Sequence, residues 1–214
     1  KKKDWFLSIL SRDNYKGWIN SKNLGVLPIG NHKISTVRTF IKASPSIKSK
    51  DIHYLSFESR VHVEEIIENW AKITLSSKHS QQFGYVYNND LRDIKQYSMD
   101  WVETAEKFIN IPYLWGGRDT KGVDCSALIQ LALQASGINI PRDTSSQITS
   151  SELYNIDKDH IERGTLVFWD GHVGVMLNKK KLIHANAFYM RTYVESLDIA
   201  CNRMKSAKFY NLKK

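Results

Sequence analysis

Cys125 is the residue of this 214-residue chain whose surroundings point most directly to chemistry. It stands between an aspartate and a serine in "GVDCSAL" (122–128), and the helix-forming run "IQLALQASG" follows at once. A cysteine in the first turn of a helix lies at the positive end of the helix dipole, which favours thiolate over thiol. The position therefore predicts either a reactive thiol or a small, inert residue at a helix start.

A thiol nucleophile needs a base, and "GTLVFWDGHVGVMLNKKKLIHANAF" (164–188) offers two histidines on adjacent predicted strands. If the loop between the strands has three residues, about 178–180, His172 and His184 share one face of the hairpin. A loop of two or four residues would put the histidines on opposite faces, unless a bulge intervenes. With an odd loop, His172 would take the proton of Cys125, and His184 would orient the imidazole of His172.

Composition limits the possible partners. The net charge of +9 comes largely from lysine-rich stretches at 1–3, 178–181 and 211–214, which indicate chain ends and a turn. These lysines do not alternate with aromatic residues along predicted strands, which disfavours nucleic-acid binding. No run approaches the roughly 20 apolar residues of a membrane-spanning helix. We therefore expect neither a nucleic-acid nor a membrane partner, and two cysteines can form at most one disulfide.

The first ninety-odd residues contain short β-prone runs separated by turn-rich segments. These runs lie at 35–41, 60–67, 69–75 and 83–87. One pattern occurs twice, because "DWFLSIL" followed by "YKGWINSKNL" is similar to "NWAKITL" followed by "FGYVYNNDL". Trp5 aligns with Trp70, and the connecting hairpin is two residues longer in the second copy.

This repeated pattern resembles the C-terminal half of a bacterial SH3-like (SH3b) module. The resemblance implies an all-β barrel over 34–95, and the C-terminal part of a first barrel over 1–26. Alternatively, residues 1–26 extend a single barrel. After a boundary near 92–97, helical spacing begins in "SMDWVETAEKFIN", with Ser98 as the expected N-cap.

The stretch "YLWGGRDTKGVDCSALIQLALQASGINIPRDTSSQ", followed by "RGTLVFWDGHVGVML" and "LIHANA", resembles the NlpC/P60 family of cysteine peptidases. The similarity covers about 105–190 and is greatest to the γ-D-glutamyl-L-diamino acid endopeptidases of that family. It implies an α+β chain in which a papain-like domain over 98–214, with helices packed on an antiparallel sheet, follows the SH3-like barrels. It implies no cofactor and no metal.

The resemblance also implies catalytic roles for particular side chains. Cys125 would be the nucleophile, His172 the general base and His184 the residue that orients it. Tyr113 would lie beside the cysteine and help to stabilise the oxyanion, and a backbone N–H near the helix start is a reasonable second donor.

In the family, the residues that flank the nucleophile help to hold the terminal amine of the substrate. This role would fall to Asp124 and Ser126. Trp115 either walls the pocket or packs in the core, and Tyr15 in "YKGW" is the candidate for a substrate-binding tyrosine of the first barrel. Three further motif residues have no expected role: Arg118, Arg142 and Gln147. Two residues depart from the common family pattern without touching the predicted relay: Ala127 replaces Gly, and Thr165 replaces Asp.

The implied function is hydrolysis of the γ-D-glutamyl–diamino acid bond of peptidoglycan stem peptides with a free N-terminal L-alanine, through an acyl-enzyme on Cys125. The alternative is a cell-wall-binding module whose peptidase-like domain is non-catalytic or acts as an amidase or acyltransferase. A zinc site is disfavoured because the sequence lacks closely spaced ligand pairs. We expect a cytoplasmic protein, or a periplasmic one if an export signal preceded these residues.

Overall fold

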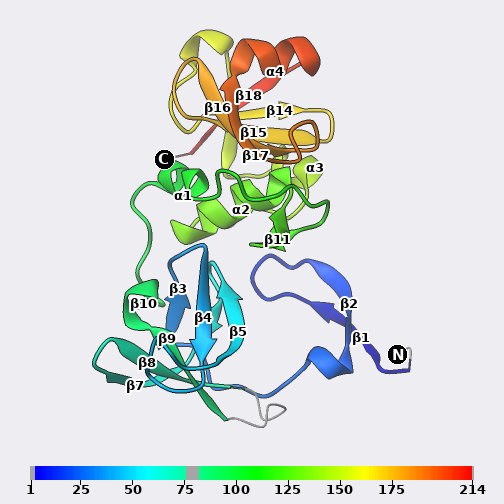
Figure 1. The fold of residues 1–214 in the computed structure, drawn as a ribbon. Coiled ribbons are helices and arrows are strands. Elements are labelled where there is room, and N and C mark those ends of the chain that lie inside the picture. Colours follow the sequence, from blue (N-terminus) through cyan, green and yellow to red (C-terminus); the bar gives the residue numbers. More distant parts are fainter. Residues whose placement is uncertain (1–2, 76–81, 214) are drawn as a thin grey trace. The chain divides into compact units, whose positions relative to one another are not determined.

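The computed structural model describes residues 3–75 and 82–213, so residues 1–2, 76–81 and 214 of the predicted domains lie outside the described residues. The backbone contacts divide the chain into two compact units. One comprises Lys1–Leu10 and Lys16–Gln96, and the other comprises Ser11–Tyr15 and Tyr97–Lys214. The break after residue 96 falls inside the predicted boundary of 92–97. Figure 1 shows the elements of both units in chain order.

The first unit is built from short strands and two 3-10 turns. Its elements are β1 (Trp5–Ile9), β2 (Lys16–Asn20), η1 (Ser21–Asn23), β3 (His32–Ile34), β4 (Arg38–Lys42), β5 (Asp51–Ser56), β6 (Arg60–Val61), β7 (Val63–Ile67), β8 (Trp70–Thr74), β9 (Phe83–Tyr87), η2 (Asn88–Asp90) and β10 (Leu91–Asp93). The predicted run at 83–87 coincides with β9, whereas the run at 60–67 forms two strands, β6 and β7.

Two antiparallel sheets enclose the core of this unit. Five strands follow the order β5-β4-β9-β8-β7, and three follow the order β10-β3-β6. Side chains from both sheets meet in one buried cluster: Ile34, Ile41, Val61, Val63, Ala71, Ile73 and Val86. The all-β character predicted for 34–95 is therefore observed, and the identification as an SH3-like barrel stays a prediction.

The partial sequence repeat is confirmed at the level of secondary structure. Trp5 begins β1 and pairs with Asn20 at the end of β2, while Trp70 begins β8 and pairs with Tyr87 at the end of β9. A 3-10 turn follows each hairpin, η1 in the first copy and η2 in the second. Among the described residues β1 and β2 pair only with each other. Whether residues 1–26 belong to a separate barrel therefore stays a prediction.

The second unit contains short helices interspersed along the chain with strands. Its elements are α1 (Trp101–Glu106), β11 (Arg118–Asp119), β12 (Gly122–Val123), α2 (Cys125–Ala135), α3 (Thr144–Gln147), β13 (Leu153–Ile156), η3 (Lys158–His160), β14 (Leu166–Trp169), β15 (His172–Met176), β16 (Lys181–Asn186), β17 (Arg191–Ser196), α4 (Leu197–Arg203) and β18 (Lys208–Leu212).

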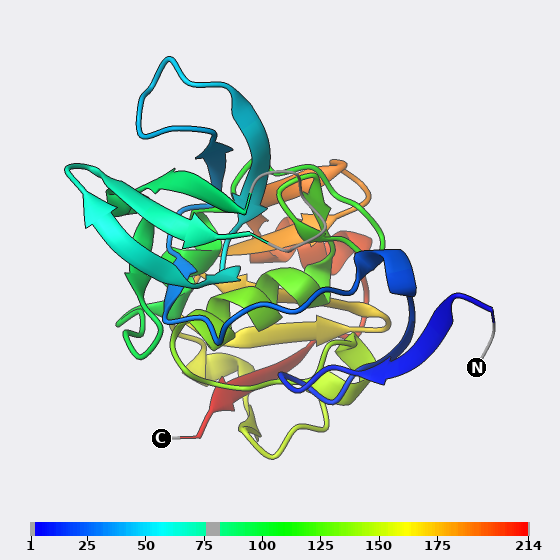
Figure 2. The same ribbon diagram turned by 90° about the horizontal axis from the view of Figure 1, so that it is seen from below.

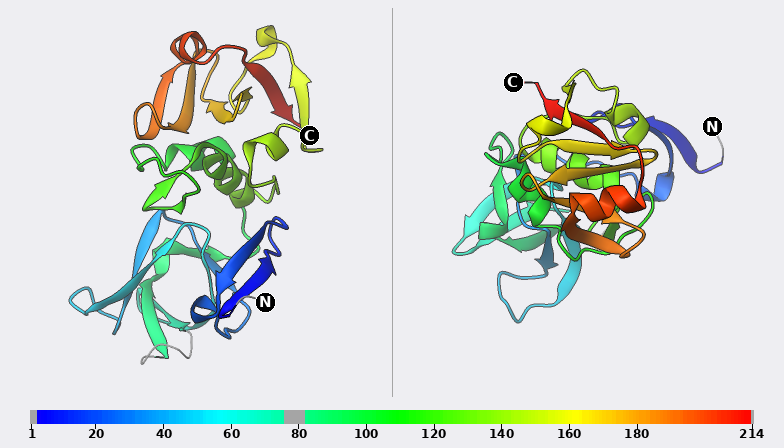
Figure 3. Two further views of the ribbon diagram at one scale, coloured as in Figure 1. Left: turned by 90° about the vertical axis from the view of Figure 1, so that its right-hand side faces the viewer. Right: turned by 90° about the horizontal axis from the view of Figure 1, so that it is seen from above.

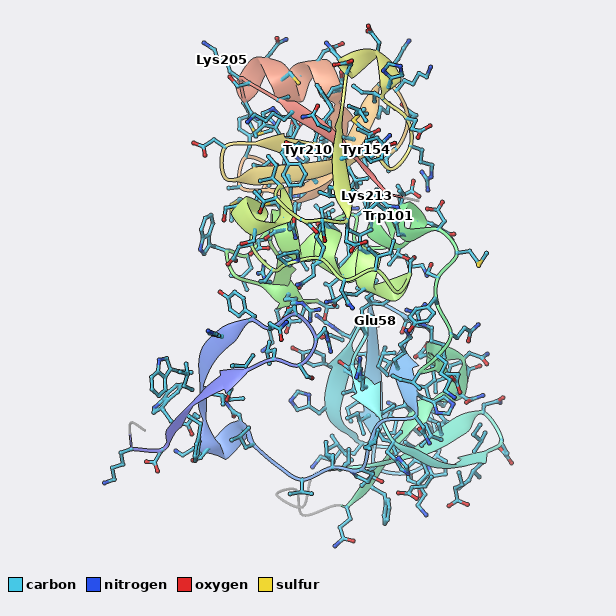
Figure 4. The ribbon with its side chains drawn as sticks, turned by 180° about the vertical axis from the view of Figure 1, so that it is seen from behind. Glu58, Trp101, Tyr154, Lys205, Tyr210 and Lys213 are labelled. Atoms are coloured by element: carbon cyan, nitrogen blue, oxygen red, sulfur yellow. The ribbon has the colours of Figure 1, made fainter. Side chains whose placement is uncertain are left out.

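Six of these strands form one antiparallel sheet in the order β13-β18-β14-β15-β16-β17. Helix α2 packs on β15 and β16, and α4 packs on β17. Figures 1 and 2 show α2 lying across one face of this sheet, and Figure 3 shows α4 on the other face. Tyr154 on the edge strand β13 and Tyr210 on β18 are labelled in Figure 4. Helices packed on an antiparallel sheet are the predicted arrangement.

The two principal helices begin at aspartate caps. Asp124 accepts a hydrogen bond from the N–H of Ala127 and caps α2, as its position predicts. The predicted N-cap of α1 is wrong by two residues: Asp100, not Ser98, accepts from the first-turn N–H groups of α1. A carboxylate can satisfy two of these N–H groups at once, and it also suits the positive end of the helix.

All residues of α2 are buried. A helix that is buried on all sides belongs to the core rather than to the surface, so α2 is the central element of this unit. No helix among the described residues is long and apolar enough to cross a membrane.

Candidate active site

Cys125 is the first residue of α2 and lies in a cleft of about 390 Å³. This volume is within the range of small-ligand sites. The cleft lies within the second unit, because the segment 11–15 groups with that unit. The residues that line the cleft include most of those predicted for the site: Tyr15, Tyr113, Trp115, Gly116, Asp124, Cys125, Ser126, Arg142, Asp143, Thr144, Ser145 and Gly171.

The sulfur of Cys125 lies against the start of β15. It is 4.0 Å from the carbonyl oxygen of Gly171 and 3.8 Å from the hydroxyl of Thr144, and the N–H of Val173 also donates toward it. These backbone groups are the immediate neighbours of His172 in the chain. The structure therefore places the predicted nucleophile against the backbone on both sides of the predicted base.

Burial decides the protonation state of this thiol. Cys125 is only 6% exposed, and burial raises its pKa above the ordinary value, although hydrogen bonds from Thr144 and the backbone act in the opposite direction. Desolvation penalises the charged form more strongly than these hydrogen bonds stabilise it, so the pKa is raised and not lowered. The raised pKa keeps the Cys125 side chain a thiol at neutral pH.

The two histidines lie on the same face of the β15–β16 hairpin. Val175 pairs with Ile183, and the N–H of Leu177 donates to the carbonyl of Lys181, which leaves residues 178–180 as the turn. The predicted odd loop is therefore confirmed. The Nε2 of His172 lies 2.8 Å from the Nδ1 of His184, a hydrogen-bonding distance.

A glycine makes room for this pair. Gly174 lies between the two histidines on their shared face, where an added Cβ would come within 3.1 Å of the His184 Cβ and 2.7 Å of a Leu182 methyl. The Leu182 methyl would have to move, and His184 would have to shift by a few tenths of an ångström. The glycine in "GHVGV" therefore allows β16 to pack against β15 at His184 without a shift of that residue.

Sequence reasoning missed the group on the far side of His184. Its Nε2 lies 2.7 Å from Oε1 of Glu195 on β17, at the distance of an ion pair but without the alignment of a directed hydrogen bond. Arg203 donates to both carboxylate oxygens of Glu195, and its presence lowers the pKa of that carboxyl group against the effect of burial. Only the strand register brings residues 184 and 195 together, so no local pattern could have indicated the contact.

Both imidazoles are neutral at ordinary pH. Burial lowers the pKa of His172 to about 3, and it lowers the pKa of His184 to about 4 although Glu195 acts in the opposite direction. The resting centre therefore pairs a neutral thiol with neutral imidazoles, not a thiolate with an imidazolium. His172 keeps a free lone pair across the whole physiological pH range, as a general base requires.

This charge state predicts the pH dependence of thiol alkylation. In a Cys201→Ala background, where Cys125 is the remaining cysteine, we expect the iodoacetamide rate to rise about tenfold per pH unit from pH 6 to pH 8. The reason is that the thiolate fraction grows in this way below a raised pKa. Stopped reactions analysed by mass spectrometry give the rates. A flat profile between pH 5 and pH 8 would indicate a preformed thiolate–imidazolium pair and contradict the assignment.

Asp124 is held by a second buried ion pair. Arg142 donates to both of its carboxylate oxygens, at 2.9 and 2.7 Å, and also donates to the Ser126 hydroxyl at 2.8 Å. Oδ2 of Asp124 accepts a further bond from the N–H of Gly116. Hydrogen bonds to Asp124 raise the pKa of Arg142 although burial opposes the charged form. These side chains bond one another, and the amine-binding role of Asp124 and Ser126 stays a prediction.

The remaining predicted residues also lie in or beside the cleft. Tyr113 bridges to Val123, which comes just before the helix cap, and burial with the nearby Cys125 raises its pKa. Trp115 is 83% exposed at the wall of the cleft, so its alternative role in the core is wrong. Tyr15 lines the cleft in the segment that Asp13 anchors through a 2.9 Å hydrogen bond from Gln130.

The motif residues without an expected role hold α2 in place. Gln147 donates to the carbonyl of Ser126, and Arg118 donates to Gln130 on the same helix. Thr165 bonds Asn211 at the far end of the sheet, and Ala127 is buried in the core. Both departures from the family pattern therefore lie outside the relay.

Two other features of the second unit do not add to this site. Within the ranges 3–75 and 82–213, no three His, Cys, Asp or Glu side chains gather in a way that could hold a metal ion. A larger hollow of about 620 Å³ is lined by β13, η3 and neighbouring residues, but it contains none of the predicted catalytic side chains. Its greater size therefore does not make it the candidate active site.

The cysteine at the start of a buried helix and the two hydrogen-bonded histidines on an adjacent antiparallel hairpin define a cysteine–histidine centre on an α+β fold. Residues 110–207 match the model of the NlpC/P60 family. This part of the chain is an NlpC/P60 family domain.

Relatives of known description agree with this result. Dipeptidyl-peptidase 6 of Lysinibacillus sphaericus is 35% identical over 45% of this chain and 35% of its own length. A gamma-D-glutamyl-L-lysine dipeptidyl-peptidase of Bacillus cereus is 26% identical over 86% of this chain and 62% of its own length. This chain therefore spans about a third to three fifths of the length of these relatives.

A solved structure shares the fold. The crystal structure of an NlpC/P60 family protein from Bacillus cereus superimposes with a TM-score of 0.82, covering 99% of this chain and 76% of that chain. The sequences are 21% identical, so this likeness shows the fold alone.

Proposed function

We propose that the protein is a cysteine peptidase that hydrolyses the γ-D-glutamyl–diamino acid bond of peptidoglycan-derived peptides. The observation that carries the proposal is the position of Cys125 in a cleft, against the backbone on both sides of His172, which in turn bonds His184. The names of the relatives support the substrate class, because they include a dipeptidyl-peptidase and gamma-D-glutamyl-L-lysine dipeptidyl-peptidases.

The chemistry follows from the protonation states. As the sulfur of Cys125 attacks the carbonyl carbon, its proton passes to Nδ1 of His172, the nitrogen that His184 does not occupy. The resulting imidazolium then gives this proton to the leaving amine as the C–N bond breaks, which leaves a thioester on Cys125. Water attacks the thioester, its proton passes through His172 to the departing sulfur, and the acid product is released.

The oxyanion of each tetrahedral intermediate needs donors close to the sulfur. The N–H of Cys125, the first residue of α2, is one that intrahelical hydrogen bonds leave open. The hydroxyl of Tyr113 lines the same cleft, and the raised pKa of this group keeps it protonated and able to donate. These two donors form the proposed oxyanion hole.

The charges of the cleft indicate how a substrate with a free amino terminus would bind. Arg142 neutralises Asp124, so the net negative charge among the lining residues comes from Asp143. This carboxylate is exposed at the cap position of α3 and makes no capping hydrogen bond there. We assign Asp143 as the partner of the substrate ammonium, with Tyr15 as a second polar neighbour in the cleft.

This assignment predicts the effect of Asp143→Asn. The KM for a peptide with a free N-terminal alanine should rise about tenfold, because a charge-assisted hydrogen bond contributes about 1.5–3 kcal/mol. Cleavage of an N-acetylated peptide should be unchanged. Asp198→Asn on α4, an exposed aspartate on the other face of the sheet, is the matched control. Equal loss for both peptides would contradict the assignment.

The proposed function is tested by mass spectrometry of L-Ala-γ-D-Glu peptides ending in meso-diaminopimelate or L-lysine, each beside an N-acetylated copy. Release of the free diamino acid from the unblocked peptides alone supports both the reaction and its specificity. Equal cleavage of the blocked copies retains the peptidase and removes the amine specificity. If no peptide is cut, the protein is a wall-binding module or acts on another bond, as an amidase or acyltransferase would.

We also propose a cytoplasmic location for the protein. Selectivity for free amino termini suits released wall peptides rather than intact wall, which favours recycling in the cytoplasm over a periplasmic role.

A further inference from the structure

We propose that Glu195 is a positioning residue that sets the tautomers of both histidines and so leaves the base nitrogen of His172 free. This inference rests on the proposed function, since it assigns a role within the same relay. It is carried by an uninterrupted series of short contacts. Nε2 of His172 lies 2.8 Å from Nδ1 of His184, and Nε2 of His184 lies 2.7 Å from Oε1 of Glu195.

The first step concerns His184 and its carboxylate neighbour. A bare imidazole nitrogen 2.7 Å from a carboxylate oxygen would set two lone pairs against each other in a buried site. The Nε2 of His184 therefore carries the proton, whether or not the contact is well aligned. Because this imidazole is neutral, its Nδ1 is left bare and can only accept.

The second step concerns His172. Since Nδ1 of His184 accepts, Nε2 of His172 must donate in the 2.8 Å contact between them. His172 is also neutral, so its Nδ1 has no proton. This is the nitrogen that can take the thiol proton of Cys125. One carboxylate thus determines the proton positions on two imidazoles in series.

Glu195 is itself held so that it can act only as an acceptor. Its side chain is 3% exposed, Arg203 donates to both of its oxygens, and the hydroxyl of Tyr189 donates to Oε2 at 3.3 Å. The guanidinium of Arg203 also stacks over the rings of Tyr189 and Phe188, at 5.6 and 4.6 Å. All of these side chains lie on the segment 188–203, between the β16–β17 turn and the end of α4.

This arrangement means that the Glu195→Gln substitution should change which ring nitrogens of the two histidines carry protons. Arg203 donates at both oxygen positions, but the Tyr189 hydroxyl donates only at Oε2, so we expect the amide oxygen at the Oε2 position, where it accepts from both side chains, and the amide NH₂ group toward His184. In the Glu195→Gln variant, Nε2 of His184 must then accept, and the proton moves to Nδ1. His172 is forced to accept at Nε2 and to carry its proton on Nδ1, the nitrogen that the proposed mechanism needs free.

The test is ¹⁵N NMR of the ring nitrogens in protein labelled with ¹⁵N-histidine, at pH 7. The His172→Asn and His184→Asn variants assign the signals. In the unmodified protein we expect both histidines as Nε2–H tautomers. In Glu195→Gln we expect both as Nδ1–H tautomers and a fall in kcat of about 100-fold or more with little change in KM, as a wrongly protonated base would give. Glu195→Asp keeps the carboxylate and should keep the tautomers.

The outcomes separate this inference from the proposed function. Nδ1–H tautomers in the unmodified protein, or unchanged tautomers in a folded Glu195→Gln variant, would overturn the role of Glu195. This holds even if Glu195→Gln fails to fold, because the spectrum of the unmodified protein is decisive alone. If the unmodified protein cuts no peptide, the proposed function fails while the tautomers still test the inference. Glu152→Gln, an exposed glutamate outside the relay, should change neither quantity.

Discussion

Replacing Cys125 with alanine should lower peptide turnover by at least about 10⁴-fold, which is the scale seen when an active-site nucleophile is removed. The alanine leaves the fold intact because position 125 starts a buried helix and alanine is the best helix former. Substrate binding should persist, since the lining residues of the cleft remain. Product release followed by mass spectrometry measures the first effect, and isothermal titration with the uncut peptide measures the second.

Cys201 provides the matched control for this variant. It is the other free cysteine of the chain, and it lies on α4, against the buried cluster on the side of the sheet away from α2. Cys201→Ala should therefore retain turnover within about twofold, although it removes the same chemical group. Turnover that survives in Cys125→Ala, or that is lost equally in both variants, would refute a nucleophilic role for Cys125.

Replacing Arg142 with methionine should lower the free energy of unfolding by about 3–5 kcal/mol, because it leaves Asp124 as a buried charge without its partner. The side chains of Arg142 and Asp124 are only 10% and 12% exposed, so solvent cannot compensate the loss. The substitution should destabilise the start of α2, because Asp124 also caps this helix. The prediction is therefore a large loss of stability from a residue that performs no chemistry.

Denaturant unfolding measures this effect, and a double-mutant cycle tests its cause. Asp124→Asn removes the charge but keeps a side chain that can cap the helix. In the Asp124→Asn background, Arg142→Met should cost much less than it does alone, because no unpaired carboxylate is left behind. Equal costs in the two backgrounds would show that Arg142 stabilises the unit through packing and not through its charge.

The candidate site could be predicted from the sequence where the chemistry is local in the chain. Cys125 at a helix start and two histidines on one hairpin follow from residue type and spacing, and the structure shows the helix start and the contact between the two histidines. The protonation state of the thiol could not be predicted in this way. It depends on burial by the whole unit, which raises the pKa of the thiol and which the local sequence does not show.

Contacts between distant parts of the chain account for what was missed in the site. Glu195 reaches His184 only through the register of β16 and β17, and Arg142 reaches Asp124 across the loop that follows α2. Their side chains are ordinary charged groups in the sequence. The need for a buried partner appears only once the fold is known.

In the first unit too, the elements with a strong local sequence pattern could be predicted and those without one could not. Strands β8 and β9 follow strong apolar alternation and were predicted within a residue or two, as was the repeat that begins at Trp5 and Trp70. Strand β5 was indicated only by a loose alternation over 53–65, because its burial pattern has no fully buried position. A strand that is stabilised by pairing with β4 more than by its own apolar face leaves little trace in the sequence.

The burial of every residue of α2 has a consequence for how such a protein can diversify. The proposed nucleophile lies at the start of an element that tolerates little change, since substitutions that alter side-chain volume inside this helix disturb the packing of the core. The other lining of the cleft comes from loops and short turns, at Tyr15, Trp115 and Asp143. New selectivity can therefore arise by exchanging these outer residues, while the reaction itself is inherited unchanged with the helix.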